Sequence, residues 1–250
     1  MGINHSIQLK TLPTYFYLFF EVDSMPPKAF VFDAYGTLFD LTSPTRKALE
    51  ERDRNNGTRL AQKVANDWRL KQLQYTWIRA ITGFHTDFWK VTTQSLDWAL
   101  ENSNLHHDSE LRTKLLSLYQ TIDVYPEVVT VLSDLKAHGH TLAILSNGNP
   151  EMLATAAKSS GINQFLDAIL SVEDVGIFKP SHKVYELVIK QYKCLPEAIQ
   201  FVSSNGWDAA AASGYGFNSV WVNRNQEPVE QLPWKPQRIL PTLKELHTSK

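Results

Sequence analysis

The sequence contains a single cysteine, Cys194, among its 250 residues. One thiol can form neither an internal disulfide bond nor a zinc site built from several thiolates, so a reducing, cytoplasmic setting is expected. The eight histidines show no His-Glu-x-x-His or similar metal-binding spacing. We therefore expect no metal ion at the functional site.

An excess of charge of either sign is also absent, because 25 lysines and arginines stand against 26 acidic residues and give a net charge of -1. This balance does not attract a polyanion, so we expect no nucleic-acid partner. The aromatic run at residues 15–20 is far shorter than the roughly 20 apolar residues that span a bilayer. We accordingly expect no membrane partner.

The two ends of the chain differ from its middle. Residues 1–24 are expected to be a loosely ordered N-terminal extension, because Met25-Pro26-Pro27 stands directly before the first core-like segment. Prolines between positions 228 and 241 indicate an extended tail, and residues 242–246 predict a short closing helix. With 43% hydrophobic and 20% charged residues, the rest has enough apolar material for a sizeable core.

Short apolar segments alternate with helix-like stretches over much of the chain. The segments typical of buried strands are 28–32, 142–145, 168–170, 199–202 and 219–222. The helix-like stretches between them are 126–138, 150–160, 181–192 and 207–213. This alternation predicts an α/β fold with a doubly wound parallel sheet.

Residues 41–122 interrupt the alternation, because they contain no strand signal. Amphipathic helices are expected at 59–80, 87–100 and 109–120. We interpret this region as a helical cap subdomain, inserted into an α/β core formed by residues 25–40 and 123–250.

Polar side chains follow the predicted strands where the apolar sequence stops. In a doubly wound sheet, ligands bind outside the carboxyl ends of the strands. The residues at these ends include Asp33, Ser146, Asn147, Lys179 and Asp208. Two carboxylates, a hydroxyl, an amide and an ammonium group are therefore expected in one cleft.

The order of these motifs resembles the haloacid dehalogenase superfamily. Its four motifs match Asp-x-Tyr-Gly-Thr-Leu, Leu-Ser-Asn-Gly, Lys-Pro and Ser-Asn-x-Trp-Asp. The resemblance covers about residues 28–224 and is closer to the type II L-2-haloacid dehalogenases, including Trp68-Arg69 and residues 71–77 of the cap. It implies a Rossmann-type core, no cofactor, and a possible homodimer. The implied activity is hydrolysis of short (S)-2-haloalkanoic acids to (R)-2-hydroxy acids through an aspartyl ester.

The resemblance also implies roles for single residues. Asp33 would be the nucleophile, Lys179 would keep it ionised, and Asp208 would activate the water that hydrolyses the ester. Ser146 and the backbone amide of Asn147 would bind the substrate carboxylate. The implied halide-binding residues are Arg69, Asn147 and Phe88, the orienting residues are Thr37, Tyr185, Ser203 and Asn205, and the pocket residues are Ala34, Tyr35 and Trp207.

Two other functions remain open at this point. Magnesium-dependent phosphatases of the superfamily carry a second aspartate where this chain has Tyr35, and an acidic residue where it has Ser203, Ser204 and Asn205. Magnesium prefers charged oxygen ligands, which disfavours that alternative. A non-catalytic relative that binds small carboxylates is the other alternative. It gains some support from Leu70, because the resembling dehalogenases usually carry glutamine there.

Overall fold

The computed structural model describes residues 26–49 and 57–247. The proposed N-terminal extension, residues 1–24, lies outside the described residues, and its loose order stays a prediction. Among the residues that the structure describes, no helix is long and apolar enough to cross a membrane.

A parallel sheet forms the centre of the structure, with the strand order β3-β2-β1-β4-β5-β6. The strands are β1 (Ala29–Phe32), β2 (Leu142–Ser146), β3 (Ala168–Ser171), β4 (Ile199–Ser203), β5 (Asn218–Val222) and β6 (Arg238–Leu240). Neighbouring strands all run in the same direction. The doubly wound parallel sheet predicted from the sequence is confirmed.

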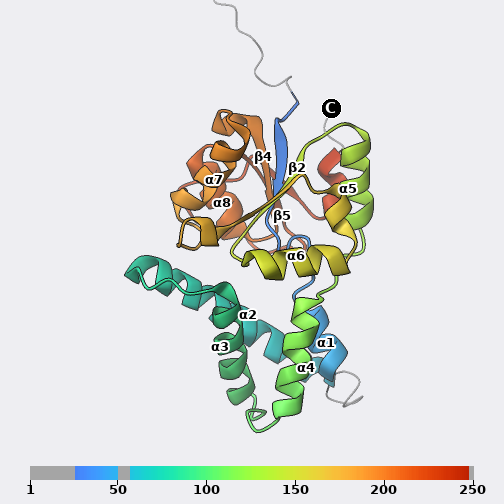
Figure 1. Ribbon diagram of the computed structural model, residues 1–250, viewed down its shortest axis with the longest axis vertical. Coiled ribbons are helices and arrows are strands. Elements are labelled where there is room, and N and C mark those ends of the chain that lie inside the picture. Colours follow the sequence, from blue (N-terminus) through green and yellow to red (C-terminus); the bar gives the residue numbers. More distant parts are fainter. Residues whose placement is uncertain (1–25, 50–56, 248–250) are drawn as a thin grey trace, which may run out of the picture.

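Helices cover both faces of this sheet, which explains why β1 and most of β2 and β4 are apolar and buried. These helices are α5 (Val128–Ala137), α6 (Pro150–Ser159), α7 (His182–Tyr192) and α8 (Gly206–Tyr215). Figure 1 shows α7 and α8 on one side of the sheet and α5 on the other. Short 3-10 helices lie at Ile162–Phe165, Val172–Asp174, Pro196–Ala198 and Leu243–His247. The last of these matches the predicted closing helix.

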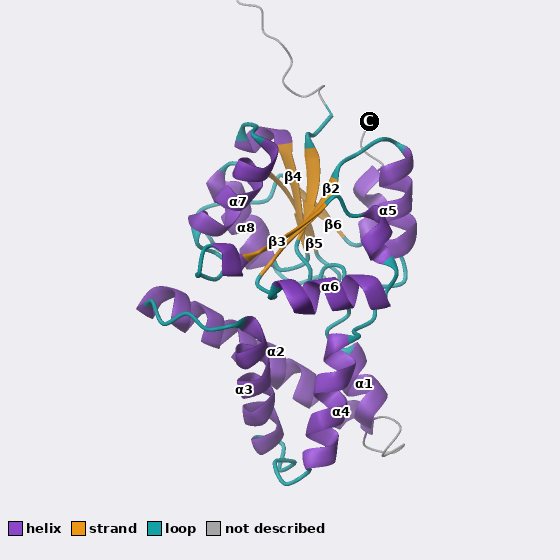
Figure 2. Cartoon of the chain, in the orientation of Figure 1, coloured by secondary structure: helices purple, strands orange, loops and turns teal. Residues whose placement is uncertain are grey.

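Four helices lie together beyond one end of the sheet (Figure 2). They are α1 (Ser43–Leu49), α2 (Gly57–Thr82), α3 (Phe88–Glu101) and α4 (Ser109–Gln120). The first N–H groups of a helix need outside acceptors. The side chains of Asp87 and Asp108 supply them for α3 and α4, at 2.7 Å to Trp89 N and 2.8 Å to Leu111 N.

The sequence analysis missed one α-helix, α1, and one strand, β6. Helix α1 has only seven residues, too few for a clear amphipathic period. Strand β6 lies within the proline-marked tail and has only three residues, which pair with β5 at the edge of the sheet. An edge position tolerates nearby prolines, because the outer backbone groups need no strand partner.

Close packing of the C-terminal tail on α8 depends on Gly214. A Cβ atom at this position would lie 2.7 Å from Cε2 and 2.8 Å from Cγ of Trp234. The change Gly214→Ala should therefore lower the free energy of unfolding by about 1–3 kcal/mol, outweighing the ~1 kcal/mol that alanine contributes to helix propensity. Urea unfolding measures the change. In a Trp234→Ala background the same substitution should be neutral or stabilising, and an equal loss there would contradict this account.

Candidate active site

Lys179 is buried between two aspartates at the carboxyl end of the sheet. Its Nζ lies 3.0 Å from Asp33 Oδ1 and 2.9 Å from Asp208 Oδ2. Asp33 follows β1 and is 6% exposed, Lys179 is 1% exposed, and Asp208 in the first turn of α8 is fully buried. One ammonium group thus serves two carboxylates in a site that excludes most water.

The second oxygen of Asp33 has two donors of its own. Thr37 Oγ1 donates to Oδ2 at 2.9 Å, and Asn205 Nδ2 donates to the same atom at 2.8 Å. Each carboxylate oxygen has about two lone-pair positions. Oδ2 is therefore saturated, whereas Oδ1 has one acceptor position beyond the bond from Lys179.

Asp208 is held through both of its oxygens. Oδ2 accepts from Lys179, and Oδ1 accepts from the hydroxyl of Tyr185 at 2.7 Å. Burial raises the pKa of Asp208 above its ordinary value, although Lys179 partly offsets this effect. Burial and the Asp208 charge raise the pKa of Tyr185 well above 10.0, so this phenol stays a hydrogen-bond donor.

The charge state of Lys179 follows from the same arrangement. Burial alone lowers the pKa of a lysine, because it disfavours the charged form. Here the nearby carboxylates of Asp208 and Asp33 outweigh burial and raise the pKa of Lys179 above its ordinary value. The ammonium group stays protonated in the folded protein.

One hydrogen bond joins the loops after β1 and β4, and a second lies within the loop after β4. The Ser204 backbone N–H donates to Thr37 Oγ1 at 2.8 Å, and the Asn205 N–H donates to Ser203 Oγ at 3.1 Å. These bonds orient the two side chains that contact Asp33 Oδ2, namely Thr37 and Asn205. The predicted residues on these two loops therefore lie together.

Ser146 and Asn147 lie at the end of the neighbouring strand, β2. Ser146 Oγ accepts the Gly148 N–H at 3.1 Å and keeps its own proton for another acceptor. Asn147 Oδ1 accepts the backbone N–H of Lys179 at 2.9 Å. Both residues are almost completely buried.

Arg69 of α2 reaches this cluster from the helical segment. Its Nη2 donates to Asn205 Oδ1 at 2.9 Å, and its Nη1 donates to Gln72 Oε1 at 3.0 Å. Burial lowers the pKa of Arg69 below its ordinary value. The sequence analysis grouped Arg69 with Asn147 and Phe88, whereas its hydrogen-bond partners are Asn205 and Gln72.

Aromatic rings form the apolar wall beside Asp33. Tyr35 has ring-centroid distances of 5.7 Å to Phe88 and 5.4 Å to Tyr119. Ala34 is fully buried. Trp207 makes its ring contact with Trp77 of α2, at 5.5 Å and nearly perpendicular, and so lies where α8 meets the helical segment.

The chain matches known proteins over most of its length. A model of the family described as haloacid dehalogenase-like hydrolase matches residues 27–216. The (S)-2-haloacid dehalogenase 1 of Pseudomonas sp. (strain CBS-3) is 40% identical over 85% of this chain and 91% of that protein.

The chain belongs to the haloacid dehalogenase-like hydrolases.

Solved structures of dehalogenases have a fold similar to that of this chain. A dehalogenase crystal structure aligns with a TM-score of 0.82 at 36% identity, over 90% of this chain and 96% of that one. The L-2-haloacid dehalogenase of Xanthobacter autotrophicus with chloropropionic acid covalently bound aligns with a TM-score of 0.77 at 32% identity, over 88% and 96% of the two chains. The resemblance found in the sequence motifs is thereby confirmed at the level of the family.

Several residues in the site of this family member were missed by the sequence analysis. Gln72, Thr92 and Tyr119 are buried polar residues on three different helices, and Gln72 contacts the other two and Arg69. The spacing of three residues between Arg69 and Gln72 places both on one side of α2. That spacing and the place of Gln72 within the matched segment 71–77 are the available signals, and neither assigns Gln72 a role. Leu70, in contrast, is 52% exposed.

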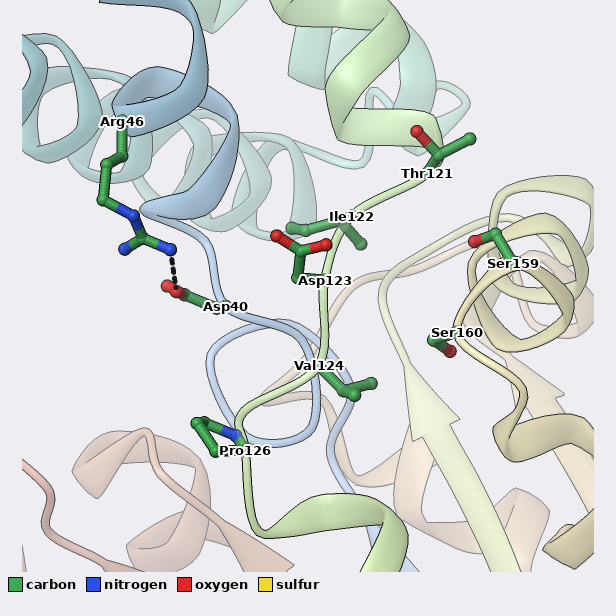
Figure 3. Close-up of a pocket in the computed structure, with 9 residues that line it drawn as sticks. All are labelled: Asp40, Arg46, Thr121, Ile122, Asp123, Val124, Pro126, Ser159 and Ser160. Atoms are coloured by element: carbon green, nitrogen blue, oxygen red, sulfur yellow. Dashed lines mark hydrogen bonds and ion pairs between the residues drawn. The ribbon is translucent and has the colours of Figure 1, made fainter. Parts of the chain in front are cut away.

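A polar cavity of about 440 Å³ lies beside the two connections between the sheet and the helical segment (Figure 3). Asp40 and Asp123 belong to these connections, and the Asp40 N–H donates to the Asp123 carbonyl at 2.8 Å. Arg46 pairs with Asp40 at 3.2 Å, and Ser159 and Ser160 close the other side. The cavity lies apart from the cluster around Asp33 and is lined by none of the predicted site residues.

Removing the shared cation should destabilise the fold. Lys179→Met leaves two buried carboxylates without a counterion, and loss of one partner of a buried pair costs about 3–5 kcal/mol. Buried acids without a counterion bind protons more readily than the same acids in the unfolded chain. The loss should therefore be greatest at neutral pH and smaller toward about pH 5.

Urea unfolding at both pH values measures this effect. The matched control is Lys190→Met, because Lys190 is an exposed lysine that pairs with Glu186 on α7 at 3.4 Å. Its loss should be below about 1 kcal/mol at either pH. Equal, pH-independent losses in the two variants would contradict the role of Lys179 as a buried counterion.

Proposed function

We propose that the protein hydrolyses short (S)-2-haloalkanoic acids to (R)-2-hydroxy acids through an ester on Asp33. The observation that carries this proposal is the buried pair of carboxylates, Asp33 and Asp208, on the single ammonium group of Lys179. This arrangement offers a nucleophile and a base in one dry site. The relatives named (S)-2-haloacid dehalogenase support the same reaction.

In the first step, Asp33 Oδ1 attacks the carbon that bears the halogen. Oδ1 is the attacking atom because Oδ2 already accepts from Thr37 and Asn205. A carbon–oxygen bond forms, the carbon–halogen bond breaks on the opposite side with inversion, and the halide leaves with the bonding electrons. Arg69 supplies N–H donors to the departing anion together with Asn147, beside the Phe88 ring.

In the second step, Asp208 accepts a proton from a water molecule as that water attacks the ester carbonyl. A bond forms between the carbonyl carbon and the water oxygen, and the bond from that carbon to the ester oxygen breaks. The hydroxy acid leaves with the second proton of the water on its oxygen, and Asp208 then releases its proton to solvent. The Asp33 carboxylate is regenerated with one oxygen from water. Tyr185 holds Asp208 in position for this proton transfer.

Recognition of the substrate carboxylate is assigned to the end of β2. The Ser146 hydroxyl accepts from Gly148 and so can donate its proton to an incoming anion. The backbone amide of Asn147 is the second donor in this proposal. Ala34, Tyr35 and Trp207 contact the alkyl part, for which an apolar wall is suited.

The phosphatase alternative fits this donor set poorly. Magnesium prefers charged oxygen ligands, but Asp33 Oδ2 is surrounded by the hydrogen-bond donors of Thr37 and Asn205. Burial raises the pKa of Tyr35 well above 10.0, so this phenol cannot replace an aspartate as the acid for a leaving alcohol near neutral pH.

We also propose that the chain is divided into a core and a cap. Residues 25–40 and 123–250 would form the core, and residues 41–122 a cap that moves to admit the substrate. Near-complete burial of Asp33, Lys179 and Asp208 supports such movement, because a substrate needs an opening to reach buried side chains. The polar cavity at the two connections leaves space for bending there.

A homodimer and a cytoplasmic location belong to the same proposal. Ile78 and Ile81 on α2, with Phe84 just after it, are 57%, 85% and 75% exposed. Figure 1 shows that this end of α2 projects beyond the other helices. A second copy of the chain would cover these apolar side chains. The single cysteine supports the reducing compartment.

Halide release tests the proposed reaction directly. The protein should release chloride from (S)-2-chloropropionate but not from the (R) enantiomer, with EDTA present. Asp33→Asn should reduce the rate at least ~1000-fold, because the amide cannot form the ester. Asp208→Asn should reduce turnover similarly and accumulate an adduct on Asp33, detectable by mass spectrometry.

The alternatives predict different results in the same assays. Magnesium-dependent hydrolysis of a phosphate ester without halide release would favour the phosphatase. Binding of the haloacid without turnover would favour the non-catalytic relative. Either result would refute the proposed function.

The acid limb of the pH profile should depend on Tyr185. Its hydroxyl lowers the pKa of Asp208 by stabilising the carboxylate, so Tyr185→Phe raises that pKa further. A base with a higher pKa loses activity at higher pH. The acid limb of kcat should therefore move up by about one pH unit, the equivalent of one hydrogen bond of ~1.4 kcal/mol.

Tyr192→Phe on the same helix is the control. The hydroxyl of Tyr192 has no hydrogen-bond partner among the described residues. This variant should keep the wild-type pH profile. If the acid limb of Tyr185→Phe did not move, the ionisation of Asp208 would not control the rate-limiting step.

A further inference from the structure

We infer that Gln72 is a positioning residue, which holds the Arg69 guanidinium in the orientation that receives the departing halide. The inference rests on the proposed function. Gln72 lies one helical turn after Arg69 on α2 and is 1% exposed. Its Oε1 accepts from Arg69 Nη1 at 3.0 Å.

The amide nitrogen of Gln72 is fully engaged by two other helices. Nε2 donates to Thr92 Oγ1 of α3 at 2.9 Å and to the Tyr119 hydroxyl of α4 at 3.0 Å. A primary amide has two N–H donors, and both are used here. The side chain is therefore fixed by three helices at once.

A backbone carbonyl fixes which groups donate and which accept in this hydrogen-bond network. Thr92 Oγ1 donates to the Phe88 carbonyl at 2.8 Å, and a carbonyl oxygen can only accept. The Thr92 hydroxyl proton is thus used, so Thr92 can only accept from Gln72. The nitrogen of the Gln72 amide must point toward Thr92, and its oxygen must point toward Arg69.

Turning the amide over would be unfavourable at two of its contacts, those with Arg69 and Thr92. The NH₂ group would then face the guanidinium, which has donors only. Desolvation by burial raises the pKa of Tyr119 to about 12, so its hydroxyl remains a neutral partner near pH 7. The network therefore has one low-energy arrangement, and that arrangement presents a carbonyl oxygen to Arg69.

Arg69 has a second contact, with Asn205, which does not belong to the helical segment. Asn205 Oδ1 accepts from Nη2 at 2.9 Å, but Asn205 belongs to the loop after β4. Gln72 shares a helix with Arg69 and travels with it if the helical segment moves. Gln72 can therefore keep the guanidinium oriented while the bond to Asn205 breaks or is exchanged for a halide.

The test compares Gln72→Met with Gln74→Met in the full-length protein. Gln74 lies on the same helix and accepts from Lys71 rather than from Arg69. In Gln72→Met, the inhibition constant for bromide should rise about tenfold, the worth of one charge-assisted hydrogen bond. Single-turnover rates should fall more for (S)-2-chloropropionate than for the bromo compound, because chloride is the poorer leaving group. Gln74→Met should behave like the wild type in both measurements.

A loss of packing alone would slow both substrates equally and leave the ratio unchanged. A folded Gln72→Met protein with wild-type bromide inhibition and a wild-type chloro-to-bromo ratio would overturn the inference. Should that variant fail to fold, Tyr119→Phe removes one acceptor of Gln72 and should raise the bromide inhibition constant by a smaller factor. Unchanged inhibition there would overturn the inference as well. Absence of halide release by the wild type would instead refute the proposed function.

Discussion

The ammonium group of Lys179 is the interaction on which the site depends. Two carboxylates within 3 Å of it are buried in the same place, and either would be strongly disfavoured there alone. Attraction over such distances is on the order of 5 kcal/mol per pair at an effective dielectric of about 20. One cation thus makes it possible to bury the proposed nucleophile and the proposed base together.

The same arrangement links the two proposed steps. The negative charge of Asp33 is one of the causes that raise the pKa of Asp208. Ester formation removes that charge. Of the two carboxylates beside Lys179, the one of Asp208 is then the one that still carries a negative charge. The proposed base therefore becomes easier to ionise at the stage when it must accept a proton. Thr37, Asn205 and Tyr185 hold the two acids in place throughout.

The sequence was sufficient where local pattern and position decide the structure. Apolar runs such as Ala29–Phe32 predicted the strands, and polar residues directly after them predicted the cluster of Asp33, Lys179 and Asp208. It was insufficient where three-dimensional neighbours decide. Strand β6 forms because β5 offers an edge. Gln72 is polar within a polar helix, and its importance depends on Thr92 and Tyr119, which lie 20 and 47 residues away.

Arg69 and Asn205 come from different parts of the molecule and meet in one hydrogen bond. In the proposed reaction, the sheet carries both bond-making groups and Asn147, while the helical segment supplies Arg69 for the departing halide and part of the wall. The Arg69 contribution to leaving-group binding and the groups of ester hydrolysis therefore lie on different segments of the chain. Substitutions on the helices alone, at positions such as Gln72 that contact Arg69, would widen or narrow the range of acceptable halogens and leave the hydrolytic groups untouched.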